Sequence, residues 1–437
     1  MHKIFLKNAR IIDGDGTPAI ENGLLVAEVP DQAKETGKIL YIGQEIACEW
    51  NQEDGDTVVD MEGYSLLPGL INTHVHLWQT AQRYPFPCDP YGVPYRTLIY
   101  ARHILEALMA GVTTVRSVGG SDDIDLGLKK ALEKGMLWGS RLITCGPPII
   151  PHGGHCHNTR GTVKCSGADA FAEAVRTEIS KGVDQIKLYY SGGASGNEHE
   201  KMNAVHIRDE EGRAACEVAH MLGKRVVAHL SNDDAIVAAV RCGVDNVEHG
   251  YSMSEDTVDY MAEKKVFYTP TLTTTSIEKS DTWTKILSSE VVERLTKVKE
   301  KHQKGCRYAI QKGLTICTGT DTLPSDKFEG TYATNYEMEL LVEAGMKPLQ
   351  AIKAATGNGA DLCEISEITG RLKEGLAADI IAVKGEPDKE IRDMRKMAMV
   401  MKGGHLVWST VDGFEQPVTT MPWRDQRAEI WGASNPW

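Results

Sequence analysis

Short apolar segments alternate with helical stretches through the middle of this chain, between residues 67 and 372. Segments 96–110, 168–181 and 209–222 carry helix-forming residues at helical spacing, and a glycine in the position of a C-terminal cap follows each of them. Parallel strands need crossover connections of this kind, so the alternation predicts an α/β fold with a parallel sheet.

Eight apolar segments qualify as strands of this sheet, and eight parallel strands close a (β/α)8 TIM barrel. We therefore predict a barrel over residues 67–372. The candidate strands end at His76, 115–117, 143–146, Lys187, His229, 248–249, 269–271 and 318–321.

Both chain ends have a different pattern, in which short strands are separated by Gly, Asp and Asn turns without helical spacing. Because the pattern is the same at both ends, we expect one small β-sandwich domain made of residues 1–66 and 373–437. Its candidate strands are 4–6, 24–26, 39–43, 57–60, 378–383 and 397–404.

The composition limits the classes of partner. Of the 437 residues, 41% are hydrophobic and 25% are charged, and the net charge is −13. No block of Lys and Arg stands out, which argues against a nucleic acid or an anionic membrane as partner. The N-terminus lacks the apolar core of a signal peptide, and no segment reaches the roughly 18 apolar residues of a membrane span. We expect a cytoplasmic protein that acts on a small molecule.

His74 and His76 end an apolar run and are separated by one residue. Alternate residues of a strand face the same side, so both imidazoles would point to one place, as metal ligands do. An isolated His-x-His pair is more simply a polar strand face. However, His229, His249 and Asp321 each end a further candidate strand, and the carboxyl ends of barrel strands meet at one rim. Together the five side chains predict a metal site.

Lys187 ends another candidate strand, just before a Gly-rich loop. An ammonium group close to metal cations is repelled and loses its proton. The neutral amine can then react with carbon dioxide to give a carbamate, which is an anionic bridge for two metals. The alternative is an ion pair with a carboxylate such as Asp184 or Glu198. The ligands at the other strand ends favour the carbamate.

These strand-end residues resemble those of the amidohydrolase superfamily, and the resemblance covers almost the whole chain. Within that superfamily, the chain looks like the imidazolonepropionase-like and prolidase-like branch with two metals, which includes aminoacyl dipeptidases and carboxypeptidases. The segments that carry the resemblance are 67–74, 153–155, 191–193, 248–250, 318–321 and 375–379.

The resemblance implies a two-metal centre. Two histidines and an aspartate would hold the more buried metal, two further histidines the more exposed one, and a carboxylated lysine would bridge both. The corresponding residues are His74, His76 and Asp321, then His229 and His249, and finally Lys187. We expect two zinc ions per subunit, with manganese or iron as alternatives, because imidazole-rich sites suit zinc.

Such a metal pair lowers the pKa of a bridging water, so that hydroxide forms near neutral pH and attacks the substrate carbonyl. Asp321 would accept the proton of this water and pass it to the leaving amine as a general acid. The predicted activity is hydrolysis of the amide bond of a dipeptide or an N-acyl amino acid. The resemblance also implies a homo-oligomer.

One position departs from the peptidase relatives. Two residues after the strand-five histidine they carry a Tyr or His that polarises the scissile carbonyl, whereas this chain has Ser231, whose side chain is too short. Tyr189 or Tyr190 could supply the missing donor, and we assign Tyr190 to the substrate site.

The remaining substrate contacts depend on loops. The resemblance gives His155 a role in binding the substrate carboxylate or in supporting the metal ligands, whereas the neighbouring His152 and His157 fit a surface loop. Arg116, near the end of the second strand, would pair with a substrate carboxylate or with a nearby acid. Specificity would be set by the loops 78–94, 146–166 and 191–205.

Three alternatives remain. A ring-opening hydrolase of cyclic amides, of the imidazolonepropionase type, and a deaminase belong to the same superfamily, but they typically use one metal and make no use of Lys187. A deaminase also carries a Glu three residues after the strand-five histidine, where this chain has Asn232. A binding or assembly protein with an inactive barrel is disfavoured, because all six ligand residues are present.

Overall fold

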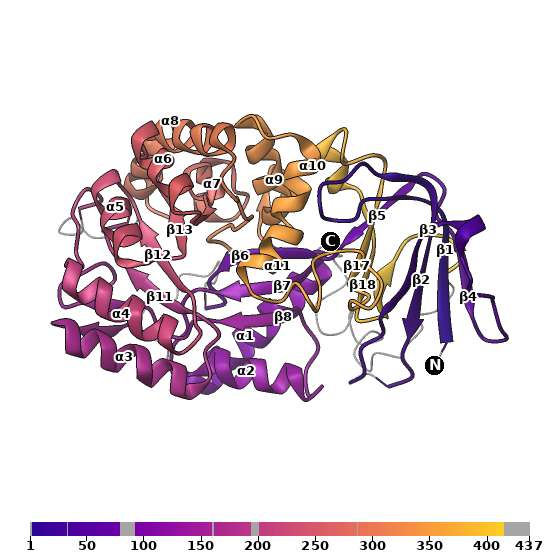
Figure 1. Ribbon diagram of the computed structural model, residues 1–437, viewed down its shortest axis with the longest axis horizontal. Coiled ribbons are helices and arrows are strands. Elements are labelled where there is room, and N and C mark those ends of the chain that lie inside the picture. The colour runs from indigo at the N-terminus through magenta and orange to yellow at the C-terminus, as the bar shows by residue number, and fades with distance from the viewer. Residues whose placement is uncertain are drawn as a thin grey trace.

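A set of parallel strands surrounded by helices lies beside a mixed sheet in the computed structural model, which describes residues 2–32, 34–78, 92–159, 161–193, 201–285 and 287–414 (Figure 1). Parts of the three loops expected to set specificity lie outside the described residues. The same holds for Glu198 and for residues 415–437 of the predicted small domain.

The parallel strands form two sheets, with the orders β6-β7-β8 and β10-β9-β11-β12-β13-β14. Every neighbouring pair in them runs parallel. The strands are β6 (Leu70–Val75), β7 (Val112–Ser117), β8 (Arg141–Thr144), β9 (Ile149–Pro151), β10 (Val163–Cys165), β11 (Ile186–Tyr189), β12 (Val226–Leu230), β13 (Asn246–His249) and β14 (Phe267–Thr269).

Backbone hydrogen bonds connect these two sheets on both sides. Asp184 and Gln185, just before β11, donate to the carbonyl of Thr144 in β8. On the other side, segment 315–318 bonds to Tyr268 of β14, and Thr73 of β6 donates to the carbonyl of Thr318. The predicted α/β architecture with parallel strands is confirmed. The eight-stranded barrel remains a prediction, which this ring of connections supports.

Helices follow the parallel strands and cover their outer side (Figure 1). The three helices predicted over 96–110, 168–181 and 209–222 are α1, α3 and α4. Glycines 182, 243 and 313 end α3, α5 and α8 with left-handed φ angles of 100°, 109° and 74°. The helices are α1 (Gly92–Met109), α2 (Ile124–Glu133), α3 (Ala168–Lys181), α4 (Asp209–Met221), α5 (Asp233–Cys242), α6 (Glu255–Glu263), α7 (Leu272–Thr275), α8 (Ser289–Lys312), α9 (Ala333–Glu343), α10 (Pro348–Ala354) and α11 (Gly357–Leu362).

Both chain ends contribute to the mixed sheet, which has its own buried apolar cluster including Leu6, Leu25 and Ile380. Its order is β19-β18-β17-β5-β1-β2-β3, with β4 also paired to β1. The pairing is continuous from edge to edge, so the sandwich form and its boundaries remain predictions. The strands are β1 (His2–Ile11), β2 (Ile20–Val29), β3 (Ile39–Gln44), β4 (Thr57–Asp60), β5 (Tyr64–Pro68), β17 (Ile380–Lys384), β18 (Met397–Lys402) and β19 (His405–Ser409).

The chain passes from the mixed sheet to the parallel strands at Gly69. A Cβ atom at this position would lie 2.2 Å from the side chain of Thr113, so no larger residue fits between β5 and β6. Asp379 ties the two parts together beside this point. Its buried carboxylate accepts hydrogen bonds from Arg141 Nη1 of β8 at 2.8 Å and from Thr369 Oγ1 at 2.7 Å. The backbone N–H of Gly403 also donates to it, at 2.8 Å.

No helix within the described ranges combines the length and the apolar character needed to cross a membrane.

Replacing Asp379 by Asn should lower the free energy of unfolding by about 2–3 kcal/mol, because the Arg141 guanidinium would lose its buried counter-charge. Burial alone would raise the pKa of Asp379, but Arg141, Lys402 and Thr369 hold it below its usual range. The carboxylate therefore stabilises the fold above its unfolded-state pKa of about 3.9, and this contribution is lost as the pH falls through the lower folded-state value. Denaturant unfolding at neutral and acid pH measures both effects.

The matched control is Glu386→Gln, which removes an exposed partner of Lys389 and should change stability by less than about 0.5 kcal/mol.

Candidate metal centre

The side chains predicted as metal ligands come from neighbouring parallel strands, and all but Lys187 lie at or near the carboxyl ends. The strand predicted to end at Lys187 continues to Tyr189, so Lys187 lies deeper in the ring. His74 lies in β6, Lys187 in β11, His229 in β12 and His249 at the last position of β13, and all four are buried. His76 directly follows β6. Asp321 follows segment 315–318, and its backbone N–H donates to the carbonyl of His74 at 2.9 Å.

Five of these six side chains lie in one cluster. Ligand atoms of His74, His249 and Asp321 lie within 4.8 Å of one another. One oxygen of Asp321 lies 3.2 Å from Nε2 of both His74 and His76. The ring of His229 adjoins that of His249, with centroids 4.5 Å apart. The spacing is small enough for metal ions to bind between these groups.

The protonation states of the cluster suit a divalent cation. Burial lowers the pKa of His76, His229 and His249, and neighbouring imidazoles lower these values further, so the rings are neutral and can act as ligands. Burial alone would raise the pKa of Asp321, but His74 and His76 hold it well below its usual range. Neutral imidazoles beside an ionised carboxylate are a donor set that zinc, manganese and iron accept.

Lys187 joins the cluster through Glu248, a residue to which the sequence analysis gave no role. Lys187 Nζ lies 2.8 Å from one oxygen of the Glu248 carboxylate, and the same oxygen contacts Nδ1 of His74. Burial alone would raise the pKa of Glu248, but His74, Lys187 and Arg116 hold it well below its usual range. Of the two carboxylates considered from the sequence, Asp184 pairs with Lys129 instead, at 2.6 Å.

Arg116 lies beneath this cluster, inside the ring of parallel strands. It is 0% exposed, and its guanidinium donates to the carbonyl of Thr73 at 2.5 Å and to the side chains of Gln185 and Asn246 at 2.8 Å each. It also contacts Glu248. Of the two partners expected for Arg116, the structure gives it the nearby acid and not the substrate, because protein acceptors surround its guanidinium.

Tyr190 also does not face the cluster. Its hydroxyl packs against α4, where a Cβ atom on Gly212 would lie only 1.6 Å from the hydroxyl oxygen. Tyr189 faces the cluster instead, with its ring 5.2 Å from that of His155 and 5.5 Å from that of His229. Strand alternation explains the correction, because Tyr189 shares a face of β11 with Lys187 and Tyr190 points the opposite way.

Ser231 does not replace the Tyr or His of the peptidase relatives. Its hydroxyl donates to the carbonyl of Gly192 at 2.6 Å, and its backbone N–H donates to Ser191 Oγ at 2.9 Å. These bonds hold the start of the Gly-rich loop against the end of β12. Ser231 Oγ also lies 3.5 Å from Nε2 of His229, but it is engaged with Gly192, which leaves Tyr189 as the candidate donor beside His229 and His155.

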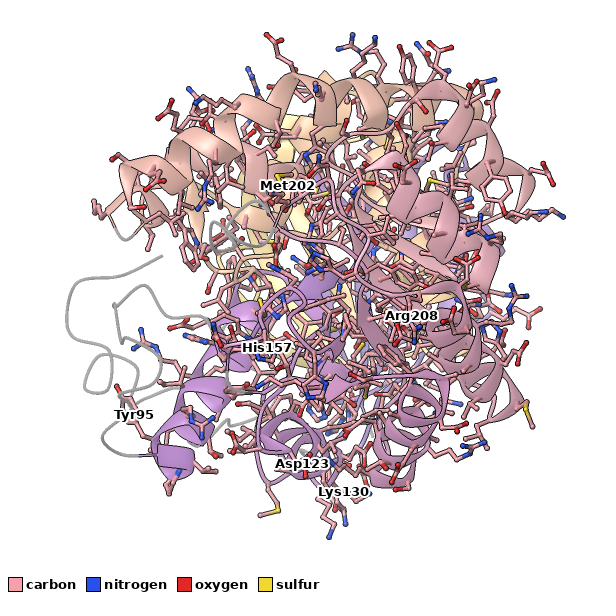
Figure 2. The ribbon with its side chains drawn as sticks, turned by 90° about the vertical axis from the view of Figure 1, so that its left-hand side faces the viewer. Tyr95, Asp123, Lys130, His157, Met202 and Arg208 are labelled. Atoms are coloured by element: carbon pink, nitrogen blue, oxygen red, sulfur yellow. The ribbon has the colours of Figure 1, made fainter. Side chains whose placement is uncertain are left out.

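His155 is the one histidine of its loop that the structure brings to the cluster. Its ring stacks on His229 with centroids 4.7 Å apart, and its Nδ1 accepts a hydrogen bond from the backbone N–H of Gly193 at 3.3 Å. His152 and His157 lie beside each other farther out, and His157 is seen on the face turned to the viewer in Figure 2. His155 is therefore the candidate substrate contact.

Two residues that the sequence analysis did not single out contact His249, one through its ring and one through its backbone carbonyl. The ring of Tyr251 stacks on that of His249 with an interplanar angle of 5°. Nε2 of His302 in α8 lies 2.9 Å from the backbone carbonyl of His249. His249 Nδ1 lies 2.7 Å from the hydroxyl of Thr271, which leaves Nε2 as its ligand atom.

Strained backbone coincides with this site. His249, Thr271 and Asp321 have φ angles of 67°, 54° and 53°, in the left-handed region that side-chain-bearing residues rarely adopt. His249 ends β13, Thr271 lies two residues after the end of β14, and Asp321 lies three residues after segment 315–318. Because of its left-handed turn, His249 joins the same cluster as Glu248, although consecutive strand residues normally face opposite sides. Such strain is typical of functional sites.

The amino-acid sequence identifies the family of this chain. The sequence profile of the Amidohydrolase family matches residues 65–407, which is most of the chain. The chain belongs to the Amidohydrolase family. The resemblance noted from the strand-end residues is thereby confirmed, and this amidohydrolase is a hydrolase of that superfamily.

Individual relatives share the amidohydrolase fold along most of their length. An ochratoxinase from Aspergillus niger is 28% identical over 374 residues, which cover 78% of this chain and 75% of the relative. Its crystal structure superposes with a TM-score of 0.78 at 26% identity, covering 93% of this chain and 95% of that one. A crystal structure of a Xaa-Pro dipeptidase with bound methionine has a TM-score of 0.80 at 26% identity, covering 93% of this chain and all of that one. An imidazolonepropionase from Kosmotoga olearia is 24% identical over 408 residues, which cover 85% of this chain and 89% of the relative.

Replacing Glu248 by Gln should lower the free energy of unfolding by about 3–5 kcal/mol, because Lys187 and Arg116 would remain buried without their shared counter-charge. Glu337 of α9 provides a matched control. It is equally buried and accepts backbone hydrogen bonds from Leu272 and Thr273 at 2.8 Å each, but burial raises its pKa to about 7. At about pH 6 the Glu337 carboxyl is already mostly neutral, so Glu337→Gln should cost only about 1 kcal/mol. Denaturant unfolding of both variants measures the difference, and equal losses would contradict the role given to Glu248.

Proposed function

We propose that this amidohydrolase cleaves the amide bond of a small N-acyl amino acid or dipeptide at a centre of two divalent metal ions. The observation that carries the proposal is the convergence of four histidines, Asp321 and a buried lysine at the ends of neighbouring strands. An ochratoxinase and a Xaa-Pro dipeptidase among the relatives with related sequence and fold support an amide as the bond cleaved.

The donor set fits two metal ions. His74, His76 and Asp321 would hold one ion, His229 and His249 the other, and a carboxylated Lys187 would bridge them. Lys187 pairs with the Glu248 carboxylate, and two bound cations would compete with this pairing by repelling an ammonium group. When bound, such ions activate water as a nucleophile and polarise a carbonyl group, and we propose zinc for both positions.

The side chains around the metal positions would transfer the proton and bind the substrate. The Asp321 carboxylate is ionised and is the most exposed member of the ligand set, with 23% of its side chain accessible, so it can accept a proton from water and transfer it to the leaving amine. Burial keeps the pKa of the Tyr189 hydroxyl well above its usual value, so this group stays protonated and can donate a hydrogen bond to the substrate carbonyl. His155 stands beside it to contact the substrate carboxylate.

A second candidate is the hydrolysis of a cyclic amide. The likeness to an imidazolonepropionase favours this alternative. Its weakness is Lys187, which could not bridge metals at a single-metal site and would keep only its ion pair with Glu248. A deaminase is less consistent with the structure, because Asn232 caps α5 by accepting a hydrogen bond from the backbone N–H of Ala235 and offers no carboxyl group.

The two-metal assignment predicts that purified wild-type protein contains two metal ions per chain and that a Lys187→Ala variant contains one or none. Removing the lysine removes the bridge between the two positions. Metal analysis by inductively coupled plasma mass spectrometry gives the counts. Lys129→Ala is the matched control, because Lys129 forms an ion pair with Asp184 near the start of β11, away from the cluster, and its loss should leave the metal content unchanged. A content of one metal or none in the wild type would refute the assignment.

The substrate assignment predicts that a panel of dipeptides, N-acyl amino acids and cyclic amides yields turnover only with the linear compounds. With the best substrate, Tyr189→Phe should lower kcat/KM by about 100-fold, as expected for the loss of a donor to the reacting carbonyl. Tyr190→Phe should have little effect, because that hydroxyl points away from the cluster. Activity confined to cyclic amides would favour the second candidate, and equal effects of the two variants would exclude Tyr189 as the donor.

A further inference from the structure

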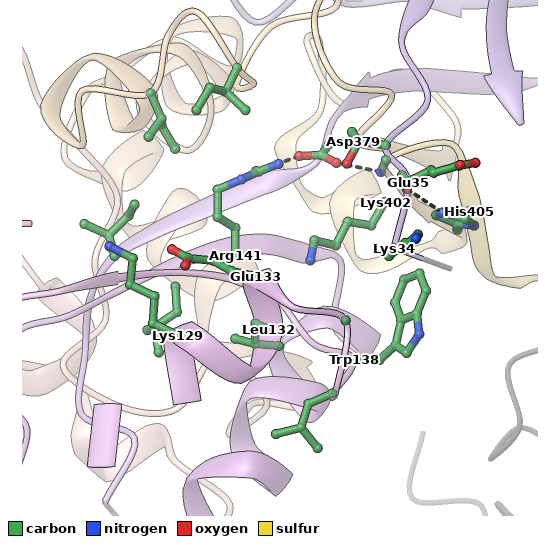
Figure 3. Close-up of a pocket in the computed structure, with 18 of the residues that line it drawn as sticks. Lys34, Glu35, Lys129, Leu132, Glu133, Trp138, Arg141, Asp379, Lys402 and His405 are labelled. Atoms are coloured by element: carbon green, nitrogen blue, oxygen red, sulfur yellow. Dashed lines mark hydrogen bonds and ion pairs between the residues drawn. The ribbon is translucent and has the colours of Figure 1, made fainter. Parts of the chain in front are cut away.

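A second cavity, of about 420 Å³, lies between the parallel strands and the mixed sheet. Its walls come from the end of α2, the start of β8 and the loop between β18 and β19 (Figure 3). The volume falls within the range of small-molecule sites, roughly 300–1,000 Å³, and such sites are frequent between domains. Arg141 is the first residue of β8 and lines this cavity, whereas the metal cluster lies at the carboxyl ends of the strands. The two sites are therefore at opposite ends of the strands.

Lys402 provides the cavity with a positive charge that no carboxylate directly neutralises. Its amine donates to the backbone carbonyl of Gly139 at 2.7 Å, and no ion pair of its amine is found among the described residues. Figure 3 shows this side chain extending into the space between Glu133 and Trp138. Burial and the nearby Arg141 lower the pKa of Lys402 to about 8. A bound anion would stabilise its charged form.

Most of the other charged side chains around the cavity form ion pairs. Arg141 bonds to Asp379 at 2.8 Å, and Lys129 bonds to Asp184 at 2.6 Å. Glu133 bonds to Lys130 at 2.9 Å, outside the cavity. Lys34 and Glu35, which also line it, are exposed on the mixed-sheet side. Lys402 is therefore the buried charged group of the cavity that is left to bind a ligand, and that ligand would be an anion.

A second polar group in the wall is His405, which has a ring nitrogen without a hydrogen-bond partner among the described residues. His405 is buried, and its Nε2 donates to the backbone carbonyl of Glu35 at 2.8 Å. Its Nδ1 is enclosed, and no described residue forms a hydrogen bond with it. Buried polar atoms without a protein partner are uncommon and call for a ligand or ordered water.

The rest of the wall is apolar and partly aromatic. The Trp138 ring packs edge-on against His405, with ring centroids 5.1 Å apart. Leu132, Ile365 and Ile368 extend this surface, and Ile368 is 46% exposed at the rim. An apolar molecule could therefore contact these side chains while its charged end reaches Lys402.

We propose that this cavity binds a small carboxylate with an aromatic or branched apolar body. The carboxylate pairs with Lys402, and the apolar body packs against Trp138 and the neighbouring aliphatic side chains. The ligand contacts both parts of the chain, because Trp138 follows α2 whereas Lys402 belongs to β18. This site is independent of the proposed amide hydrolysis.

The probe for this site is 4-fluorophenylacetate, followed by ¹⁹F NMR line broadening as the full-length protein is titrated. Wild-type protein should broaden the signal in a saturable manner, and the uncharged 4-fluorobenzyl alcohol should bind about tenfold more weakly, because it lacks the charge-assisted contact. Lys402→Met should weaken binding of the acid by about the same factor. Lys389→Met, which removes an exposed lysine paired with Glu386, should leave binding unchanged.

Two further variants separate this site from the metal centre and guard against misfolding. Ile368→Trp fills the rim from a partly exposed position that the core does not depend on, so it should abolish binding in a folded protein. Asp321→Asn alters only the metal centre and should leave probe binding intact. The proposal is overturned if wild-type protein shows no saturable binding at millimolar probe. It is also overturned if binding survives both Lys402→Met and Ile368→Trp, and loss of binding in Asp321→Asn alone would place the probe at the metal centre.

Discussion

The buried Glu248 carboxylate is the interaction on which the rest of the site depends. It contacts Arg116 below, Lys187 beside it and His74 of the first strand, so one negative charge holds groups from β6, β7 and β11 together. Removing this carboxylate would leave the buried Arg116 and Lys187 without their shared counter-charge, which is costly in a low-dielectric interior.

The two ends of the parallel strands have separate tasks. At their carboxyl ends, strained backbone at His249 and Asp321 turns ligand-type side chains toward one cluster. At their amino ends, Arg141 and Asp379 join the strands to the mixed sheet beside a cavity into which Lys402 extends. Because binding at either end acts on the same strands, a ligand in the second cavity would stabilise the packing of the two parts without contacting the metal centre.

Strand alternation and burial explain where prediction from the sequence succeeded and where it did not. The His-x-His spacing placed both rings on one side, because residues two apart share a strand face. The same rule favours Tyr189 over Tyr190, since Tyr189 shares its face with Lys187, and the sequence analysis did not apply it. Arg116 was left between two partners because its acid, Glu248, lies 132 residues away in the sequence. β7 and β13 are not neighbouring strands, so only the arrangement of all the parallel strands in the ring brings Arg116 within reach of Glu248.

The sequence by itself determined the α/β class, the strand ends that carry ligands and the membership of the Amidohydrolase family. These features depend on local periodicity and on residue types at fixed spacings, both of which are visible in the sequence. Only the tertiary structure decided that Glu248 pairs with Lys187 and that Lys402 projects into a second cavity. Both depend on contacts between residues far apart in the chain, which no local pattern encodes.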